Sequence, residues 1–147
     1  MSTQVTINWR KHYFDELNEI DENYNNFLYA IARGKTILYI GKAFRQYVSD
    51  RIYNNLERKD INSRGVYLWI GEIDNENSSF TRISDELICD VENLLIYYYE
   101  STYNEKNINN YNGRNNLRII NNDIESCFHK IIEWKNELVY SDQLKEF

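Results

Sequence analysis

Three short stretches of this chain are apolar enough to predict β-strands. Residues 27–32 and 36–40 are apolar runs separated by Arg33-Gly34-Lys35, and a glycine in so short a connection predicts a tight hairpin. Residues 66–73 are rich in β-branched and aromatic side chains on both faces, which predicts a central strand. We therefore expect a small, mainly antiparallel three-stranded sheet with strands at 27–33, 35–40 and 65–73.

Two further stretches change to helical periodicity, at about 100° per residue. The first follows Gly41 and predicts a helix over 43–57, with one apolar face made by Phe44, Tyr47, Val48, Ile52 and Leu56. The second predicts a helix over 84–99, with an apolar stripe made by Ile83, Leu87, Val91, Leu94, Leu95 and Tyr98. The expected fold class is therefore mixed α/β (α+β), with these helices flanking the three-stranded sheet.

Polar residues interrupt the apolar faces of both predicted helices. Arg51 and Asn55, one turn apart, fall inside the apolar arc of the first helix, and Arg45 lies between Ile52 and Leu56 on the same wheel. In the second helix Glu92 lies at the edge of the apolar face. Because a charge on a buried face is costly unless it is paired or faces a cleft, we expect these side chains to be paired or to face a cleft. The alternative for Glu92 is that it merely flanks the core.

The two ends of the chain carry weaker patterns. Residues 1–26 are expected to form an N-terminal arm that begins with a short strand and continues into an acidic stretch of helical spacing. Residues 105–147 are expected to form a C-terminal extension. It begins Asn-rich, with a short edge strand at Leu117–Ile120, and ends in a helix from Ile124 to about Val139 that carries a solvated His129.

Length and composition bound the class of protein. A chain of 147 residues that is 42% apolar fits a single globular domain. No run approaches the roughly 20 apolar residues of a membrane span, and the N-terminus lacks the apolar core of a signal peptide. Cys89 and Cys127 are too few and too far apart for a disulfide framework. We expect an intracellular, cytoplasmic protein that does not enter a membrane.

The charge is unevenly distributed. The net charge is −6, yet residues 29–64 contain eight basic and three acidic residues, which gives 8 − 3 = +5 and leaves −6 − 5 = −11 for the remainder. This asymmetry favours a local surface that faces phosphates. The alternative is that these charges are solvated flanks of a hairpin and a helix. A proline-free composition rich in Asn, Ile and Tyr hints at an AT-rich bacterial or phage genome.

The order of these elements resembles the GIY-YIG nuclease superfamily. Phe27-Leu28-Tyr29 is similar to its degenerate GIY element, and Tyr39-Ile40-Gly41 is its YIG element unaltered. The run that begins Glu92-Asn93-Leu94 is similar to the family's metal-binding helix. The resemblance covers residues 27–104 and aligns the positions Tyr29, Tyr39, Gly41, Arg51, Glu92 and Asn104 in the family's order.

The resemblance implies a metal-dependent endonuclease that hydrolyses phosphodiester bonds in DNA. Glu92 would bind Mg²⁺ or Mn²⁺, and Arg51 would clamp the scissile phosphate with its planar fork. Tyr29 would act as general base or orient the water, and Tyr39 would hold the phosphate or the water. A phenol titrates near 10, so the role of base requires cations beside Tyr29. The residues expected to bind substrate are Gly41, Lys42, Arg45, Asn55 and Asn104.

Two departures from the family pattern leave alternatives open. The interval between Gly41 and Arg51 is longer than in the commonest members, so Arg45 is a rival for the catalytic arginine. Asn55 stands where several members carry histidine or tyrosine, so catalysis is full, reduced or absent. Sequence specificity has to come from the domain's own loops, from a homodimer or from a protein partner, since no separate DNA-reading module is attached.

Three interpretations follow from these patterns. The first is an active endonuclease, which we favour. The second is a nucleic-acid-binding or regulatory protein that has kept the fold and lost turnover. The third is an α/β interaction domain in which the tyrosines are core residues; absent DNA binding, with Tyr29 and Glu92 far apart, would favour it.

Overall fold

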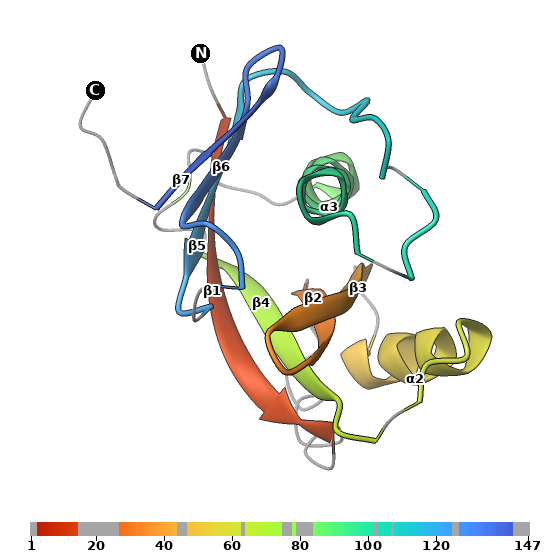
Figure 1. The fold of residues 1–147 in the computed structure, drawn as a ribbon. Coiled ribbons are helices and arrows are strands. Elements are labelled where there is room, and N and C mark those ends of the chain that lie inside the picture. The colour runs from red at the N-terminus through yellow and green to blue at the C-terminus, as the bar shows by residue number, and fades with distance from the viewer. Residues whose placement is uncertain are drawn as a thin grey trace.

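A strongly curled sheet dominates the computed structural model, which describes residues 3–14, 27–43, 47–62, 64–74, 78, 84–101, 103–106, 108–124 and 127–142 (Figure 1). The described residues form seven strands and two helices. The strands are β1 (Thr3–Tyr13), β2 (Phe27–Arg33), β3 (Thr36–Ala43), β4 (Tyr67–Asp74), β5 (Leu117–Asn122), β6 (Ile131–Trp134) and β7 (Leu138–Ser141). The helices are α2 (Val48–Arg58) and α3 (Asp85–Tyr99).

All seven strands belong to one sheet, in the order β3-β2-β4-β1-β5-β6-β7. The neighbouring strands are antiparallel except β1 and β5, which are parallel. The predicted fold class, a small three-stranded sheet flanked by helices, is therefore wrong. The three predicted strands form one end of a larger mixed sheet, because both ends of the chain add strands to it.

The two helices cover opposite faces of the sheet at β2. Leu28, Ala30 and Ala32 point into the core that contains α3. Phe27, Tyr29 and Ile31 point into a second core that contains Ile52 and Leu56 of α2. Strand β2 is buried on both faces because the two cores meet there, and this explains why its sequence is continuously apolar.

The central elements lie close to their predicted positions. Strands β2, β3 and β4 overlap the predicted strands, and β4 lies inside the sheet between β2 and β1, as expected of a central strand. Helix α3 matches its predicted range within one residue. Helix α2 begins later than predicted: Tyr47 precedes it and is 47% exposed, so its assignment to the apolar face is wrong. Phe44, Arg45 and Ile83 lie outside the described residues.

The predicted C-terminal helix is wrong, because its range contains strands β6 and β7. Asn136 adopts a positive φ of 62° in the turn between them, a conformation that Asn tolerates and that ends the helical pattern. Strand β6 pairs with β5 and places Ile132 and Trp134 against the main core. His129 is not solvated as predicted. It is half-buried, and its backbone N–H donates to the hydroxyl of Tyr98 at 3.1 Å.

The predicted arm and edge strand are both interior strands. Strand β1 extends over 11 residues and lies between β4 and β5. Strand β5 lies between β1 and β6, so its prediction as an edge strand is wrong. The acidic stretch after Phe14 lies outside the described residues. In the part of the chain that the structure describes, neither helix is both long and apolar enough to cross a membrane.

Candidate functional site

The β2–β3 hairpin fixes Tyr29 and Gly41 opposite each other. The two residues are register partners, and the ring of Tyr29 is fully buried. A Cβ at Gly41 would lie 2.4 Å from Cζ and Oη of Tyr29, so any larger residue at this position would displace the ring. The ring of Tyr39 lies 6.2 Å from that of Tyr29, between centroids, and is half-buried. The hairpin therefore needs glycine at position 41 to seat Tyr29.

Helix α2 presents Arg51 and Asn55 to the hairpin. The side chain of Asn55 is buried, and its amide donates to the hydroxyl of Tyr29 and, at 2.9 Å, to the carbonyl of Arg51. Arg51 is half-buried, and its Nε has no hydrogen-bond partner among the described residues. Both residues thus face inward, as the helical wheel predicts. The buried donor on Arg51 is costly without an acceptor, which is a feature of a site that receives an anionic ligand.

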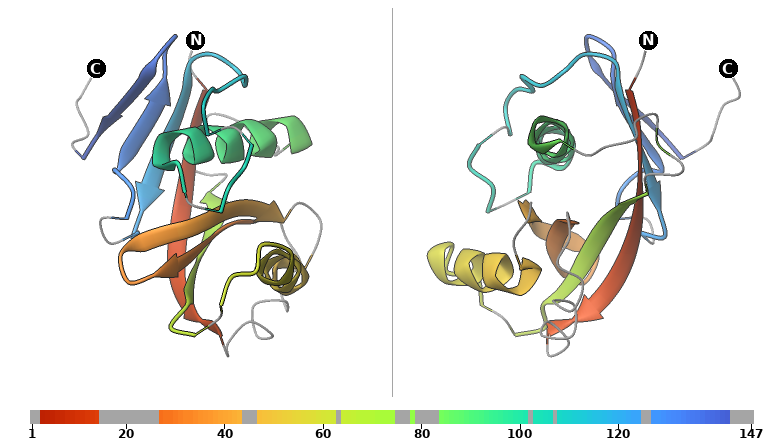
Figure 2. Two further views of the ribbon diagram at one scale, coloured as in Figure 1. Left: turned by 45° about the vertical axis from the view of Figure 1, so that its right-hand side comes forward. Right: turned by 180° about the vertical axis from the view of Figure 1, so that it is seen from behind.

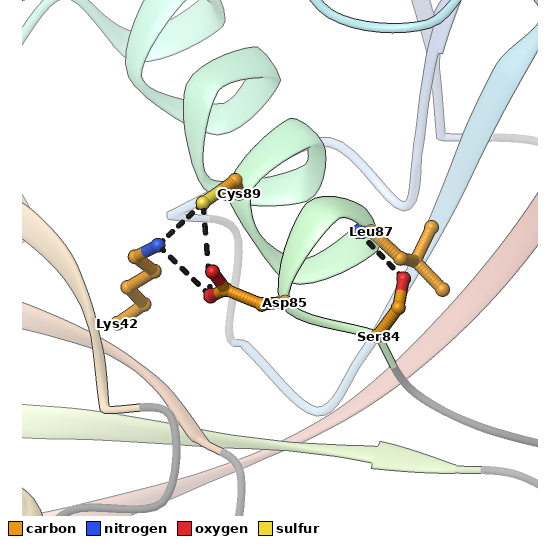
Figure 3. Close-up of polar contacts among 5 residues, drawn as sticks. All are labelled: Lys42, Ser84, Asp85, Leu87 and Cys89. Carbon is orange, nitrogen blue, oxygen red and sulfur yellow. Dashed lines mark hydrogen bonds and ion pairs between the residues drawn. The ribbon is translucent and has the colours of Figure 1, made fainter.

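Helix α3 brings a row of ionisable residues to the end of β3. The helix begins at the cap of Ser84, whose hydroxyl accepts from the N–H of Leu87 at 3.1 Å. One turn further on, Cys89 contacts the Nζ of Lys42, which also lies 3.5 Å from Asp85 (Figure 3). Glu92 follows on the same side of α3, one turn after Cys89. Lys42 therefore joins β3 to the helix face that carries Glu92.

The carboxyl group of Glu92 is buried, and the positive charges near it do not offset the cost of that burial to its ionised form. Burial raises the pKa of Glu92 to about 7, although the positive charges of Lys42 and Arg51 oppose this shift. The group is therefore partly protonated at neutral pH, unlike an ordinary surface glutamate. A carboxyl group with a pKa near 7 is suited to transfer protons or to bind an added cation.

The two tyrosines of the hairpin remain protonated at neutral pH. Burial raises the pKa of Tyr29, the proximity of Tyr39 and Glu92 adds to the shift, and Arg51 only partly offsets it. Burial and the charge of Glu92 likewise raise the pKa of Tyr39. Arg51 is a cation close enough to lower the pKa of Tyr29, as the role of general base requires, but burial outweighs it. The geometry favours Tyr29 as a neutral hydrogen-bond donor.

The charge of Lys42 is maintained despite its partial burial. Burial lowers the pKa of Lys42, but the hydrogen bond to Cys89 and the charges of Cys89, Glu92 and Asp85 raise it above the ordinary value overall. Lys42 is therefore a fixed cation beside Glu92. The sequence analysis did not select Asp85 and Cys89. Their spacing from Glu92, at seven and three residues along one helix, is the signal that would have revealed them.

Asn104 has a different position from the one expected of a substrate-binding residue. Its side chain accepts from the N–H of Ile40 at 2.9 Å and donates to the carbonyl of Ile40 at 3.0 Å. The N–H of Tyr103 also donates to the carbonyl of Leu38 at 3.0 Å. These contacts extend the sheet along the open edge of β3. Asn104 therefore holds the strand that carries Tyr39 and Gly41.

The structure brings together most of the predicted site residues, and we call this group the site cluster: Tyr29, Tyr39, Lys42, Arg51, Asn55 and Glu92. Electrostatic effects among them reach across two strands and two helices. Arg45 lies outside the described residues, so Arg51 is the arginine that the structure places here. Glu92 influences the pKa of Tyr29, so the wide separation of these two residues that would favour the third interpretation is not observed.

The site cluster fits a divalent cation only if one protein carboxylate, that of Glu92, binds it. The described residues contain no group of three or more His, Cys, Asp and Glu side chains arranged to hold a metal ion. A single carboxylate is nevertheless sufficient for Mg²⁺ when water and phosphate oxygens complete its octahedron. Glu92 matches that requirement, because it is a half-buried carboxyl group whose ionised form lacks sufficient positive charge nearby.

Comparisons with known proteins do not assign a family to the chain. No protein-family model matches it, and neither a curated protein nor a solved structure shows significant similarity to it. The fold and the site cluster therefore define the protein, over its described residues, only as a seven-stranded sheet with two helices. At the edge of this sheet lies a polar site whose buried carboxyl group has a raised pKa. The resemblance to GIY-YIG nucleases remains a prediction from the motifs.

Proposed function

We propose that the protein is a metal-dependent endonuclease that hydrolyses phosphodiester bonds in DNA. The observation that supports this proposal best is the meeting of Glu92, Arg51 and the two hairpin tyrosines, which come from α3, α2 and β2–β3. Phosphodiester hydrolysis requires charge neutralisation at the phosphoryl oxygens and hydrogen bonds to the attacking water. A half-buried arginine, two neutral phenols and a carboxyl group with a pKa of about 7 supply these functions.

Arg51 is the residue that would bind the scissile phosphate. Its guanidinium group presents donors in a planar fork that matches two phosphate oxygens. The buried Nε of Arg51 has no acceptor among the described residues, so a phosphate would satisfy it. Lys42 adds a second positive charge near the same carboxyl group. The pair of cations would hold a phosphate and oppose its charge.

Tyr29 would orient the attacking water. The amide of Asn55 donates to the oxygen of Tyr29, which leaves the hydroxyl proton of Tyr29 free to donate elsewhere. Several GIY-YIG members carry histidine or tyrosine at the position of Asn55. Here Asn55 fixes the direction in which the hydroxyl of Tyr29 donates.

Glu92 would also be the protein ligand of Mg²⁺ or Mn²⁺. When bound, such a cation would polarise the scissile phosphate and stabilise the leaving oxygen. Its charge would favour the ionised carboxylate, which burial disfavours. Metal binding and ionisation of Glu92 would therefore support each other.

A second candidate is a DNA-binding protein without turnover. The specific observation that favours it is the raised pKa of the buried Tyr29, combined with Asn55 in place of an ionisable side chain. A site with these two features binds an anion through Arg51 and Lys42 but activates water weakly. This candidate predicts DNA binding that is independent of metal and no cleavage.

The experiment that separates the two candidates compares the wild type with Glu92→Gln. Supercoiled plasmid and branched DNA are incubated with each protein in EDTA, Mg²⁺ and Mn²⁺. The endonuclease proposal predicts metal-dependent nicking that falls roughly 10³-fold or more in the variant. Glu86→Gln, an exposed change on the same helix, is the matched control and should cleave normally.

One outcome would contradict the role of Glu92, and another would contradict the endonuclease itself. Metal-dependent cleavage that persists in Glu92→Gln would remove Glu92 from the mechanism. No cleavage by the wild type, combined with a retained mobility shift of DNA in EDTA, would favour the binding protein.

A further inference from the structure

A second charged region lies where β1 and β2 end and β4 begins. Tyr67, the first residue of β4, pairs with Tyr13 of β1 on one side and with Ala32 of β2 on the other. The hairpin turn follows β2 directly, and Figure 2 shows this turn and the C-terminal end of β1 at the same end of the sheet. We call this group the basic sheet end: Lys11, Tyr13, Arg33, Lys35, Arg64 and Tyr67.

The charges along this part of the sheet are segregated by sign. The described ranges 3–14, 27–43 and 64–71 contain basic residues and no acidic ones. The acidic residues of β4 are Glu72 and Asp74, and Asp74 pairs with Thr6 near the start of β1. The opposite end of β4 therefore carries the negative charge. Lys11, Arg33, Lys35 and Arg64 are all exposed, so their charges face solvent.

Aromatic rings lie among these cations. The Nζ of Lys11 lies 4.3 Å from the ring centroid of Tyr67 and 5.8 Å from that of Tyr13. The hydroxyl of Tyr67 donates to the carbonyl of Gly34, which ties β4 to the hairpin turn. The ring of Tyr13 is 60% exposed, more than any other large hydrophobic side chain that the structure describes. An exposed ring is thus held beside cations on paired strands rather than on a loop.

We propose that the basic sheet end binds a single-stranded stretch of DNA beside the phosphate that enters the site cluster. Cations that follow a phosphate backbone and aromatic rings that stack on bases are the combination that binds single strands. A paired base within a duplex has no free face, so Tyr13 can stack only on an unpaired one. This inference deepens the proposed function and rests on it for the role of the bound strand.

The two regions meet at Arg33, which lies on the face of β2 that carries Tyr29. Lys11, Tyr13 and Tyr67 lie on the opposite face, so one strand would contact both regions by crossing the end of the sheet. Tyr29 of the site cluster and Arg33 of the basic sheet end lie four residues apart on β2, which is about 13 Å. Strand β1, which supplies Lys11 and Tyr13, is outside the range 27–104 that resembles the nuclease family. The predicted substrate is therefore DNA with an unpaired flank, and the added strand β1 helps to select it.

The test measures binding by fluorescence anisotropy in EDTA, with the full chain and a labelled oligothymidine of roughly 12 nucleotides. Tyr13→Ala should weaken binding roughly 5- to 100-fold through lost stacking. Lys35→Ala and Arg64→Ala should each reduce the slope of log affinity against log salt by about 0.7. Circular dichroism of each variant reports whether it is folded, and only folded variants are compared.

Lys135→Ala is the control for net charge, because it also removes one exposed positive charge. It also removes an ion pair with Glu133 at 3.4 Å, so its folding is checked before it is compared. Lys135 follows β6, whose pairing with β5 and then β1 places it at the Thr3 end of β1. That end is roughly 33 Å from Tyr13 along the 11-residue strand. Affinity and salt slope should equal those of the wild type. An equal effect from Lys135→Ala would overturn the proposal, because it would reduce the binding to a general effect of net charge.

Three further outcomes would overturn it. They are unchanged affinity in Tyr13→Ala, equally tight binding of the corresponding duplex, and tighter binding of an oligouridine of the same length. Failure of the proposed function is distinguishable from all of these. Binding is measured in EDTA, where no metal-dependent cleavage occurs, so an inactive wild type that still binds through Tyr13 would refute the nuclease and leave this surface intact.

Discussion

Two polar clusters in this molecule balance their charges in different ways. The site cluster combines Glu92, whose pKa is raised to about 7, with Arg51, whose buried Nε lacks an acceptor among the described residues. The second group, which we call the sheet cluster, consists of two separate buried polar pairs, Arg118 with Glu133 and Trp9 with Asn121. There Glu133 is buried beside Arg118 at 3.6 Å, and the indole N–H of Trp9 donates to Asn121 at 2.9 Å.

The difference separates a structural use of polar groups from a functional one. In the sheet cluster Glu133 lies beside Arg118, and Asn121 accepts from Trp9 and donates to the carbonyl of His129 at 3.0 Å. The Nε of Arg118 lacks a hydrogen-bond partner among the described residues, as does that of Arg51, so the clusters differ in their carboxyl groups. In the site cluster burial outweighs the local cations, and a carboxyl group is left partly protonated. Groups held in an unfavourable state by the fold are typical of sites that bind or react. Removing a charge should therefore have opposite effects on stability in the two clusters.

The largest effect is expected for Glu92 as a function of pH. Its folded-state pKa of about 7 lies above the ordinary value of 4.5, so the folded protein binds the proton more tightly. Stability from this group is fully present below about pH 4.5 and is lost as the pH rises to about 7. The loss is about 3 kcal/mol in wild-type protein. Glu92→Gln should therefore be about 3 kcal/mol more stable than the wild type near pH 8 and similar to it near pH 4.

Urea denaturation in EDTA at both pH values measures this difference. Glu86→Gln, an exposed change, should shift the free energy of unfolding by no more than about 0.5 kcal/mol at either pH. A Glu92→Gln variant that is destabilised near pH 8 would show that Glu92 is paired like the residues of the sheet cluster.

A smaller effect of the opposite sign is expected in the sheet cluster. Glu133→Gln leaves the guanidinium group of Arg118, whose side chain is 14% exposed, without its carboxylate. We expect the free energy of unfolding to fall by about 2 kcal/mol, because a buried cation loses its partner. The measurement is urea denaturation near pH 7, with DNA cleavage assayed on the same samples. Unchanged stability would mean that the pair is as dispensable as a surface ion pair.

The smallest effect is expected for Tyr29→Phe. The ring stays in place, and Asn55 loses the hydroxyl but retains the carbonyl of Arg51 as an acceptor. We expect a loss of about 1 kcal/mol by urea denaturation near pH 8. A fall of more than about 3 kcal/mol in the free energy of unfolding would mean that this hydroxyl stabilises the fold as the polar groups of the sheet cluster do. The contrast between the two clusters would then be weaker.

The sequence predicted the part of the fold whose signals are local. The hairpin at Gly34 and the two-sided apolarity of β4 each depend on neighbouring residues, and these elements formed close to where they were expected. The inward direction of Arg51 and Asn55 followed from the helical wheel alone. Most of the site cluster could therefore be selected before the structure, although Asp85 and Cys89 were overlooked.

The rest depended on contacts between distant segments. Strand β1 pairs with β5 more than a hundred residues later, for example Val5 with Ile119, and no local pattern encodes that partner. The range 131–141 has apolar spacing that suits a helix, but its pairing with β5 makes it a hairpin. Tertiary contacts overrode the periodicity, and the predicted small sheet became a seven-stranded one.

The parallel pairing of β1 with β5 also governs the order in which the protein assembles. During synthesis the N-terminal strand leaves the ribosome first, and one of its edges remains open until residues 117–122 have emerged. At about 5–20 residues per second this interval lasts several seconds, during which that edge is available to other chains. Such a distant pairing also slows folding, because a long loop must close before the contact forms. The nascent chain therefore depends on rapid synthesis or on a chaperone to protect the open edge of β1 until β5 pairs with it.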